Sequence, residues 1–217
     1  MTHPAWHLFI YRLPASPSRA RVGVWRELRR LGALQLQQAV SAFPDCGDIA
    51  AALDAVEERV GSEGGTVYRF LLDNLNDRQQ AQLRAEWTAL REHEYAELIE
   101  ECETKFRREV EFEIFRNNLT GSEAEEIEAD LEKIHAWFQR ISARDWFGAA
   151  NRPAAEAALT DCQRLLDDFV ERVFLAEVDA GQSTALPAPL SWDPPRRAQG
   201  EDNLTPSDAV PPARAIS

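Results

Sequence analysis

The chain has 217 residues, 44% of them hydrophobic, and a formal net charge of −13. This length and apolar share suit one or two globular domains with a sizeable core. No apolar run approaches the ~20 residues that cross a bilayer, and the N-terminal residues lack the basic and apolar regions of an export signal. We therefore expect a cytoplasmic protein with no membrane partner.

Positive charge is concentrated at the start of this acidic chain. Residues 1–44 hold six arginines and one acid, Glu27, so they carry +5 while the remainder carries −18. The overall charge repels polyphosphate, but a local cluster of arginine suits phosphate and tetrahedral oxyanions because the guanidinium fork is planar. A GC-rich genome would produce the same preference for arginine without any function, so this alternative stays open.

The first 74 residues alternate between strand and helix patterns. Apolar residues at 8–11 predict a strand, and the stretch from Pro17 to Gly32 predicts a helix. Residues 33–43 suit either one bent strand or a short hairpin, a helix is expected to follow over 49–60, and a last strand over 66–72. The order predicts an α+β fold that begins with a ferredoxin-like domain at 5–74, with two helices on one face of a small sheet.

The first helix carries an arginine ridge. Arg19, Arg26 and Arg30 recur at i, i+7 and i+11, within roughly 40° of one another on a helical wheel. An apolar stripe of Val24, Trp25, Leu28 and Leu31 is expected to face the core on the other side. A solvated surface is the alternative to binding. The residues that we predict to contact DNA phosphates are Arg12, Arg19, Arg26, Arg29 and Arg30.

The second half predicts three amphipathic helices. A charged helix is expected over 77–116, and the next carries an apolar stripe from Ile127 to Ile141. The last begins near Pro153, and short loops favour antiparallel packing. We expect a three-helix domain at 75–178 and a proline-rich, disordered tail at 179–217.

Two sequence blocks resemble a known family. The first is LFIYR-x-P-x-x-P-SRAR-x-x-VWR-x-L-x-RLGAL-x-LQQ, which begins at Leu8. The second has Trp137, Ile141 and then Arg144-Asp145-Trp146-Phe147-Gly148. Together they resemble the ChrB N-terminal domain of bacterial chromate-resistance regulators, over about 6–174.

The resemblance implies a regulatory protein that acts on transcription through DNA or a partner protein. Known chromate-responsive members carry a further C-terminal domain, where we expect this chain to end in its tail. The N-terminal outline is also similar to Cas2-type and PaaX-type domains, which supports a binding role by analogy. A pure protein-interaction module is the alternative function, and a second copy of the chain is another partner considered.

An oxyanion effector, chromate or sulfate, is the other ligand considered. We predict that Arg21 and Arg144, the latter with His135, donate the charge-assisted hydrogen bonds such a dianion needs. The structural alternative pairs Arg21 with a buried acid or a carbonyl. For Arg144 and Asp145 the alternative is to lock the end of a helix while both neighbouring aromatic residues pack into the core.

Catalysis is not expected. Cas2-type nucleases place an aspartate at the end of the first strand to bind a metal ion, and this chain has Arg12 there, which cannot hold Mg²⁺. Glu132 and His135 form one Glu-x-x-His pair, but Leu90 stands where a second pair ending at His93 would need its acid. The three cysteines, at 46, 102 and 162, fit neither a disulfide framework nor a zinc site. We predict no enzyme activity, cofactor or metal site.

Overall fold

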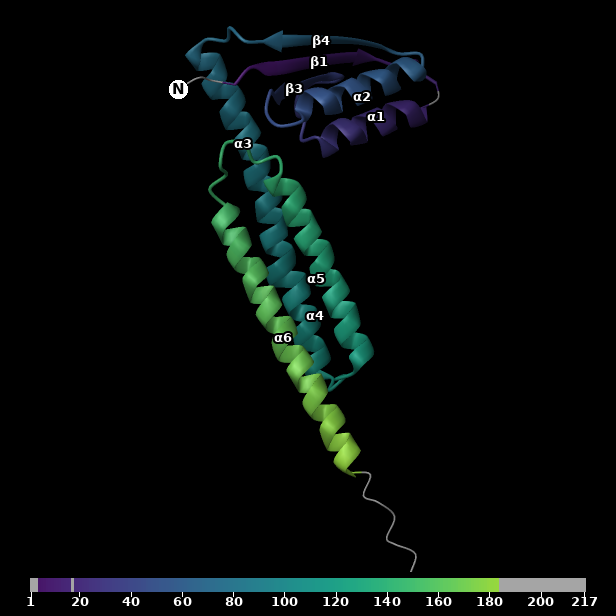
Figure 1. Ribbon diagram of the computed structural model, residues 1–217, viewed down its shortest axis with the longest axis vertical. Coiled ribbons are helices and arrows are strands. Elements are labelled where there is room, and N and C mark those ends of the chain that lie inside the picture. Colours follow the sequence, from purple (N-terminus) through teal and green to yellow (C-terminus); the bar gives the residue numbers. More distant parts are fainter. Residues whose placement is uncertain (1–3, 17, 184–217) are drawn as a thin grey trace, which may run out of the picture.

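The computed structural model describes residues 4–16 and 18–183, and Figure 1 shows a sheet with two helices from which a bundle of long helices projects. The sheet is antiparallel, with strand order β2-β3-β1-β4. The elements follow the predicted order: strand, helix, two strands, helix and strand. Residues 33–43 form a hairpin rather than one bent strand. The elements are β1 (Trp6–Arg12), α1 (Ser18–Arg30), β2 (Leu34–Gln37), β3 (Val40–Pro44), α2 (Ile49–Ser62) and β4 (Thr66–Leu72).

The first core lies between the sheet and helices α1 and α2. Phe9 of β1 and Phe43 of β3 are fully buried, together with Val24 and Leu28 of α1 and an apolar stripe of α2. The prediction for Trp25 was wrong, because 40% of its surface is exposed. It lies at the edge of the apolar stripe, where the sheet does not cover it.

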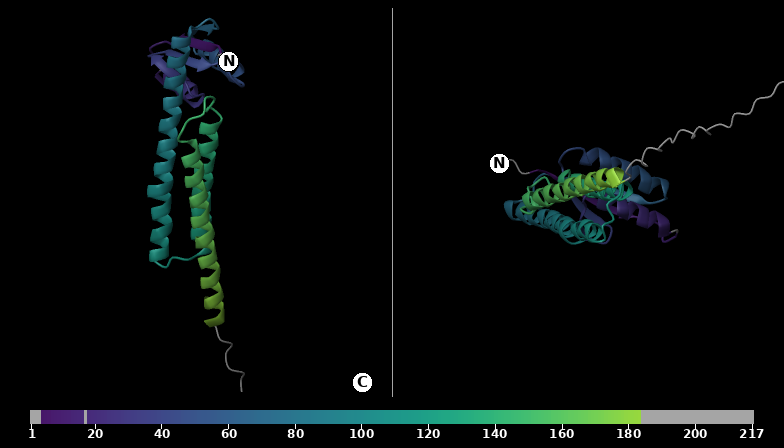
Figure 2. Two further views of the ribbon diagram at one scale, coloured as in Figure 1. Left: turned by 90° about the vertical axis from the view of Figure 1, so that its left-hand side faces the viewer. Right: turned by 90° about the horizontal axis from the view of Figure 1, so that it is seen from below.

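The bundle consists of a continuous rod and two further helices. The rod comprises α3 (Asp77–Glu100), a π-helix η1 (Glu101–Phe106) and α4 (Arg107–Phe115). It packs against α5 (Gly121–Ser142) and α6 (Arg152–Ser183), which lie beside each other (Figure 2). Helix α6 continues past the boundary expected at 178, and the rest of the predicted tail, 184–217, lies outside the described residues.

The π-helix keeps one side of the rod facing the core. Leu98, Cys102, Phe106 and Val110 are spaced by four residues and are all buried. In an α-helix of 3.6 residues per turn, this spacing would rotate each successive side chain by about 40°. The wider turns of the π-helix remove part of that rotation, so the four side chains stay in the core.

Two of the three thiols are buried in the bundle. Cys102 and Cys162 lie on facing helices, and the Cys162 thiol donates to the Cys102 carbonyl over 3.9 Å. Hydrogen bonding with Cys162, and then burial, raises the pKa of Cys102. Because Cys46 is partly exposed while the other two thiols are buried, access favours Cys46, and we expect an aromatic disulfide reagent to modify it first. Mass spectrometry of briefly treated native protein would contradict this if Cys102 or Cys162 reacted as fast as Cys46.

Gly32 lies where the sheet domain meets the bundle. Its φ of +86° follows the last turn of α1, and an added Cβ would lie 2.9 Å from Arg91 Nη1 and 3.0 Å from Arg144 Cδ. We expect Gly32→Ala to lower the free energy of unfolding by about 2 kcal/mol, from backbone strain and crowding. In urea denaturation Gly61→Ala is the matched control, since a Cβ there meets nothing within 4 Å. The control should be neutral or stabilising, and an equal loss in both variants would contradict the account.

Candidate nucleic-acid interface

Helix α1 presents a cationic surface to solvent, which we call the arginine face: Arg19, Arg26, Arg29 and Arg30 of α1, with Arg12 at the end of β1. All five side chains belong to exposed residues. Ala20, Val24 and Leu28 bury the opposite side of the helix. The helical period therefore turns Val24 and Leu28 to the core and the arginines to water, as predicted, whereas Trp25 stays partly exposed.

Within the described chain, the arginine face carries positive charge that no neighbouring carboxylate pairs with. Among residues 4–16 and 18–183, none of its five guanidinium groups forms an ion pair with a carboxylate. The one acid of α1, Glu27, is bound by Arg59 of α2, with 2.6 Å between Glu27 Oε2 and Arg59 Nη1. The positive charge of the helix is therefore left for a partner outside this part of the chain.

Part of this arrangement also stabilises the helix. Arg29 and Arg30 stand in the last turn of α1, where positive charge interacts favourably with the helix dipole by about 0.3 to 1 kcal/mol. The Arg29 guanidinium lies over the Trp25 ring, 5.2 Å from its centroid. Neither contact uses the N–H groups of the Arg29 guanidinium, which can therefore donate to a ligand.

Arg21 belongs to a different surface from the arginine face. Its Nη1 donates to the carbonyls of Pro14, over 3.2 Å, and Ala15. This is the carbonyl pairing considered from the sequence, although Arg21 is exposed rather than buried. The contact ties the start of α1 to the loop after β1.

A hollow of ≈ 620 Å³ opens beside Arg21, between the end of β1, helix α1 and the β2–β3 hairpin. It brings together two arginines that the sequence assigned to different ligands, Arg12 and Arg21. The sequence did not indicate the rest of the lining, because the aromatic and amide residues come from three separate elements. The residues of this hollow, the arginine pocket, are Tyr11, Arg12, Leu13, Arg21, Val22, Trp25, Gln35, Gln38 and Ala39.

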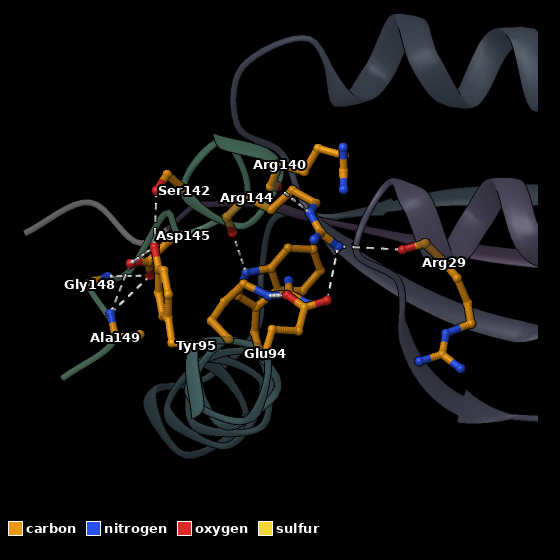
Figure 3. Close-up of polar contacts among 11 residues, drawn as sticks. Arg29, Glu94, Tyr95, Arg140, Ser142, Arg144, Asp145, Gly148 and Ala149 are labelled. Atoms are coloured by element: carbon orange, nitrogen blue, oxygen red, sulfur yellow. Dashed lines mark hydrogen bonds and ion pairs between the residues drawn. The ribbon is translucent and has the colours of Figure 1, made fainter. Parts of the chain in front are cut away.

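Arg144 joins the bundle to the end of α1 (Figure 3). Its Nη1 lies 3.2 Å from Glu94 Oε1 of α3 and 3.5 Å from the Arg29 carbonyl, and its Nε donates to the Arg140 carbonyl. The Trp87 indole donates to the Arg144 carbonyl over 3.0 Å. These partners occupy the guanidinium group, so the geometry favours the structural alternative over oxyanion binding.

Asp145 closes the turn after α5. One carboxylate oxygen accepts from the backbone N–H groups of Gly148 and Ala149, and the other lies 3.4 Å from the Tyr95 hydroxyl (Figure 3). Phe147 stacks on Trp6 with ring centroids 5.9 Å apart. Trp146, expected in the core, is 44% exposed and instead covers the backbone at Gly47.

A buried cation lies next to this junction. Arg91 is 2% exposed, its Nε donates to Glu94 Oε2 over 2.6 Å, and its guanidinium lies over Trp87. Burial lowers the pKa of Arg91, and the Glu94 carboxylate opposes that effect. Glu94 therefore compensates both Arg91 and Arg144, which the helical pattern of the sequence could not reveal.

His135 lies apart from the other two predicted oxyanion ligands. Its Nδ1 is 3.2 Å from the Leu131 carbonyl, and its side chain lines a shallow hollow with residues of α6. Arg21 lines the arginine pocket, Arg144 pairs with Glu94, and neither lines the hollow beside His135, so the structure does not gather the three residues into one site. Within the described ranges, no three His, Cys, Asp or Glu side chains converge to hold a metal ion.

The fold and this surface define a class of protein, an α+β protein with an exposed arginine face on its first helix and a helical bundle that projects from the sheet domain. The family described as Protein ChrB, N-terminal, matches residues 21–180, and the chain belongs to that family. The chain is also 28% identical over 193 residues to Protein ChrB of Cupriavidus metallidurans. That alignment covers 89% of this chain and 52% of the relative, so the chain spans about half the length of the curated protein it matches.

Membrane insertion finds no support in the helices. Across residues 4–16 and 18–183, none is at once long enough and apolar enough to span a bilayer.

Proposed function

We propose that this protein is a non-catalytic regulator associated with chromate resistance, which acts on transcription by binding DNA through the arginine face. The observation that carries the proposal is the exposure of five arginines with no carboxylate partner in the described chain, on a protein of net charge −13. Family membership supplies the link to chromate resistance. The resemblance of the two sequence blocks to chromate-resistance regulators implies a regulatory role, and DNA is then the polyanion that would fit this surface.

The fold supports the same proposal. The strand order β2-β3-β1-β4, with α1 and α2 as crossovers, is the arrangement that we assign to the ferredoxin-like class. Such a domain places α1 on its outer surface, where a helix can approach a phosphate backbone. In Figure 1 the bundle extends from one end of the sheet domain, on the side of the sheet where α1 and α2 lie.

The experiment is a titration of the full chain into fluorescent duplexes, one from the region upstream of its own gene and one unrelated. Five phosphate contacts predict that log K falls with log salt with a slope of about −4.5, so raising salt from about 50 to 200 mM weakens binding roughly 500-fold. Tighter binding to the upstream duplex at moderate salt supports regulation. Absence of binding to either duplex at low salt would reject the proposal.

An interaction module is the second candidate, and the far end of the bundle favours it. Phe112 and Phe115 of α4 are 54% and 86% exposed, and Phe174 and Leu175 of α6 are 63% and 53% exposed. Exposed large apolar groups gathered at one end commonly mark a protein contact. Sedimentation velocity over a range of protein concentrations tests whether a second copy is the partner.

A further inference from the structure

The arginine pocket has a composition that fits one kind of ligand. Two of its nine lining residues are arginines and none is acidic, in a chain with an excess of acids. Burial raises the pKa of Tyr11, so its phenol stays neutral and adds no negative charge. The electrostatics of the hollow therefore select an anion.

The size of the hollow excludes a small inorganic anion as its full occupant. Its ≈ 620 Å³ is the space of about twenty waters at ~30 Å³ each, whereas a tetrahedral oxyanion has five heavy atoms. The volume falls within the range of pockets that hold whole organic ligands. An anion that fills this pocket must carry a larger body.

The other residues that line the arginine pocket indicate the chemistry of the rest of the ligand. Trp25 is 40% exposed, and because the Arg29 guanidinium lies over one face of its ring, a flat group would stack on the other face, with Val22 and Leu13 as apolar neighbours. Gln35 and Gln38 of the hairpin supply amides that both donate and accept hydrogen bonds, the pairing that the edge of a nucleobase offers. The arginines match a phosphate, the Trp25 ring matches a planar base, and the two amides match the edge of that base.

We propose that the arginine pocket binds a nucleotide, with its phosphate on Arg12 and Arg21, its base against Trp25 and the base edge on Gln35 and Gln38. The nucleotide is either a free mononucleotide or an unpaired nucleotide within a nucleic acid. The proposal goes beyond duplex binding by the arginine face and does not require it. Arg21 is already held by the Pro14 carbonyl, so part of the pocket is ordered before the ligand arrives.

The test is isothermal titration of the full chain with AMP, GMP, adenosine, inorganic phosphate and a short single-stranded oligonucleotide. We expect the mononucleotides to bind at least tenfold more tightly than adenosine or phosphate, since each of these lacks one half of the recognised groups. A free nucleotide that binds as tightly as the oligonucleotide identifies the small molecule as the ligand. An oligonucleotide that binds much more tightly identifies nucleic acid.

Variants locate the site. Arg12→Ala should weaken nucleotide binding about tenfold, Trp25→Ala similarly, and Trp25→Phe less because a ring remains for stacking. Arg26→Ala with Arg30→Ala, outside the pocket, should leave mononucleotide binding unchanged, which separates failure here from failure of duplex binding. Circular dichroism confirms that each variant is folded. The proposal is overturned if no nucleotide binds at millimolar concentration, if phosphate alone binds equally well, or if Arg12→Ala and Trp25→Ala bind like the parent chain.

Discussion

Glu94→Gln is expected to lower the free energy of unfolding by about 3 kcal/mol, because it removes the carboxylate shared by two arginines at the junction of sheet and bundle. Arg91 is almost fully buried, and its side chain is 3% exposed in the ion pair with Glu94. Within the described chain its Nη1 already lacks a hydrogen-bond partner. A buried cation that loses its counter-charge is among the more damaging single changes.

Urea denaturation followed by circular dichroism measures this effect. Glu97→Gln is the matched control, one turn further along the same helix, where the carboxylate lies 3.3 Å from an exposed histidine, His93. An exposed pair of this kind contributes at most about 1 kcal/mol. If both variants lost the same stability, the junction would not depend on the charge of Glu94.

Reversing two charges on the arginine face should weaken duplex binding roughly 100-fold at low salt. Arg26→Glu with Arg30→Glu removes two phosphate contacts and adds two repulsions, while both positions are exposed and so should tolerate the change. Fluorescence anisotropy with the upstream duplex gives the affinity.

The matched control for this pair is Arg108→Glu with Arg172→Glu. These arginines are exposed on α4 and α6, and the change in net charge is the same. The control should bind within a few-fold of the parent chain. A similar loss in both pairs would show that net charge, rather than this surface, governs binding.

Much of the fold follows from local pattern. The apolar spacing of Val24 and Leu28, and of Ile127 and Leu131, was enough to place the helices, because burial of one stripe dominates their energetics. The prediction for Trp25 was wrong because a helical wheel does not show where the buried stripe ends. Whether a residue at the margin is covered depends on the neighbouring elements, which local periodicity does not encode.

The two candidate sites also differ in how far the sequence could predict them. The arginine face could be predicted because all but one of its residues share one helix, and the spacing of residues along a helix fixes the direction in which each side chain points. The arginine pocket could not, since Gln35 and Gln38 reach it only through the folding of the hairpin. Arg144 looked available in the sequence because Glu94 is fifty residues away, and only tertiary packing brings the two within 3.2 Å.

The most direct measurement of the central claim is the slope of log K against log salt for a duplex, compared between the parent chain and Arg19→Ala with Arg26→Ala and Arg30→Ala. Removing three phosphate contacts should make the slope shallower by about 3. A variant that remains folded and keeps the parent slope would show that DNA, if bound at all, contacts another surface, and the role given to α1 would then be wrong.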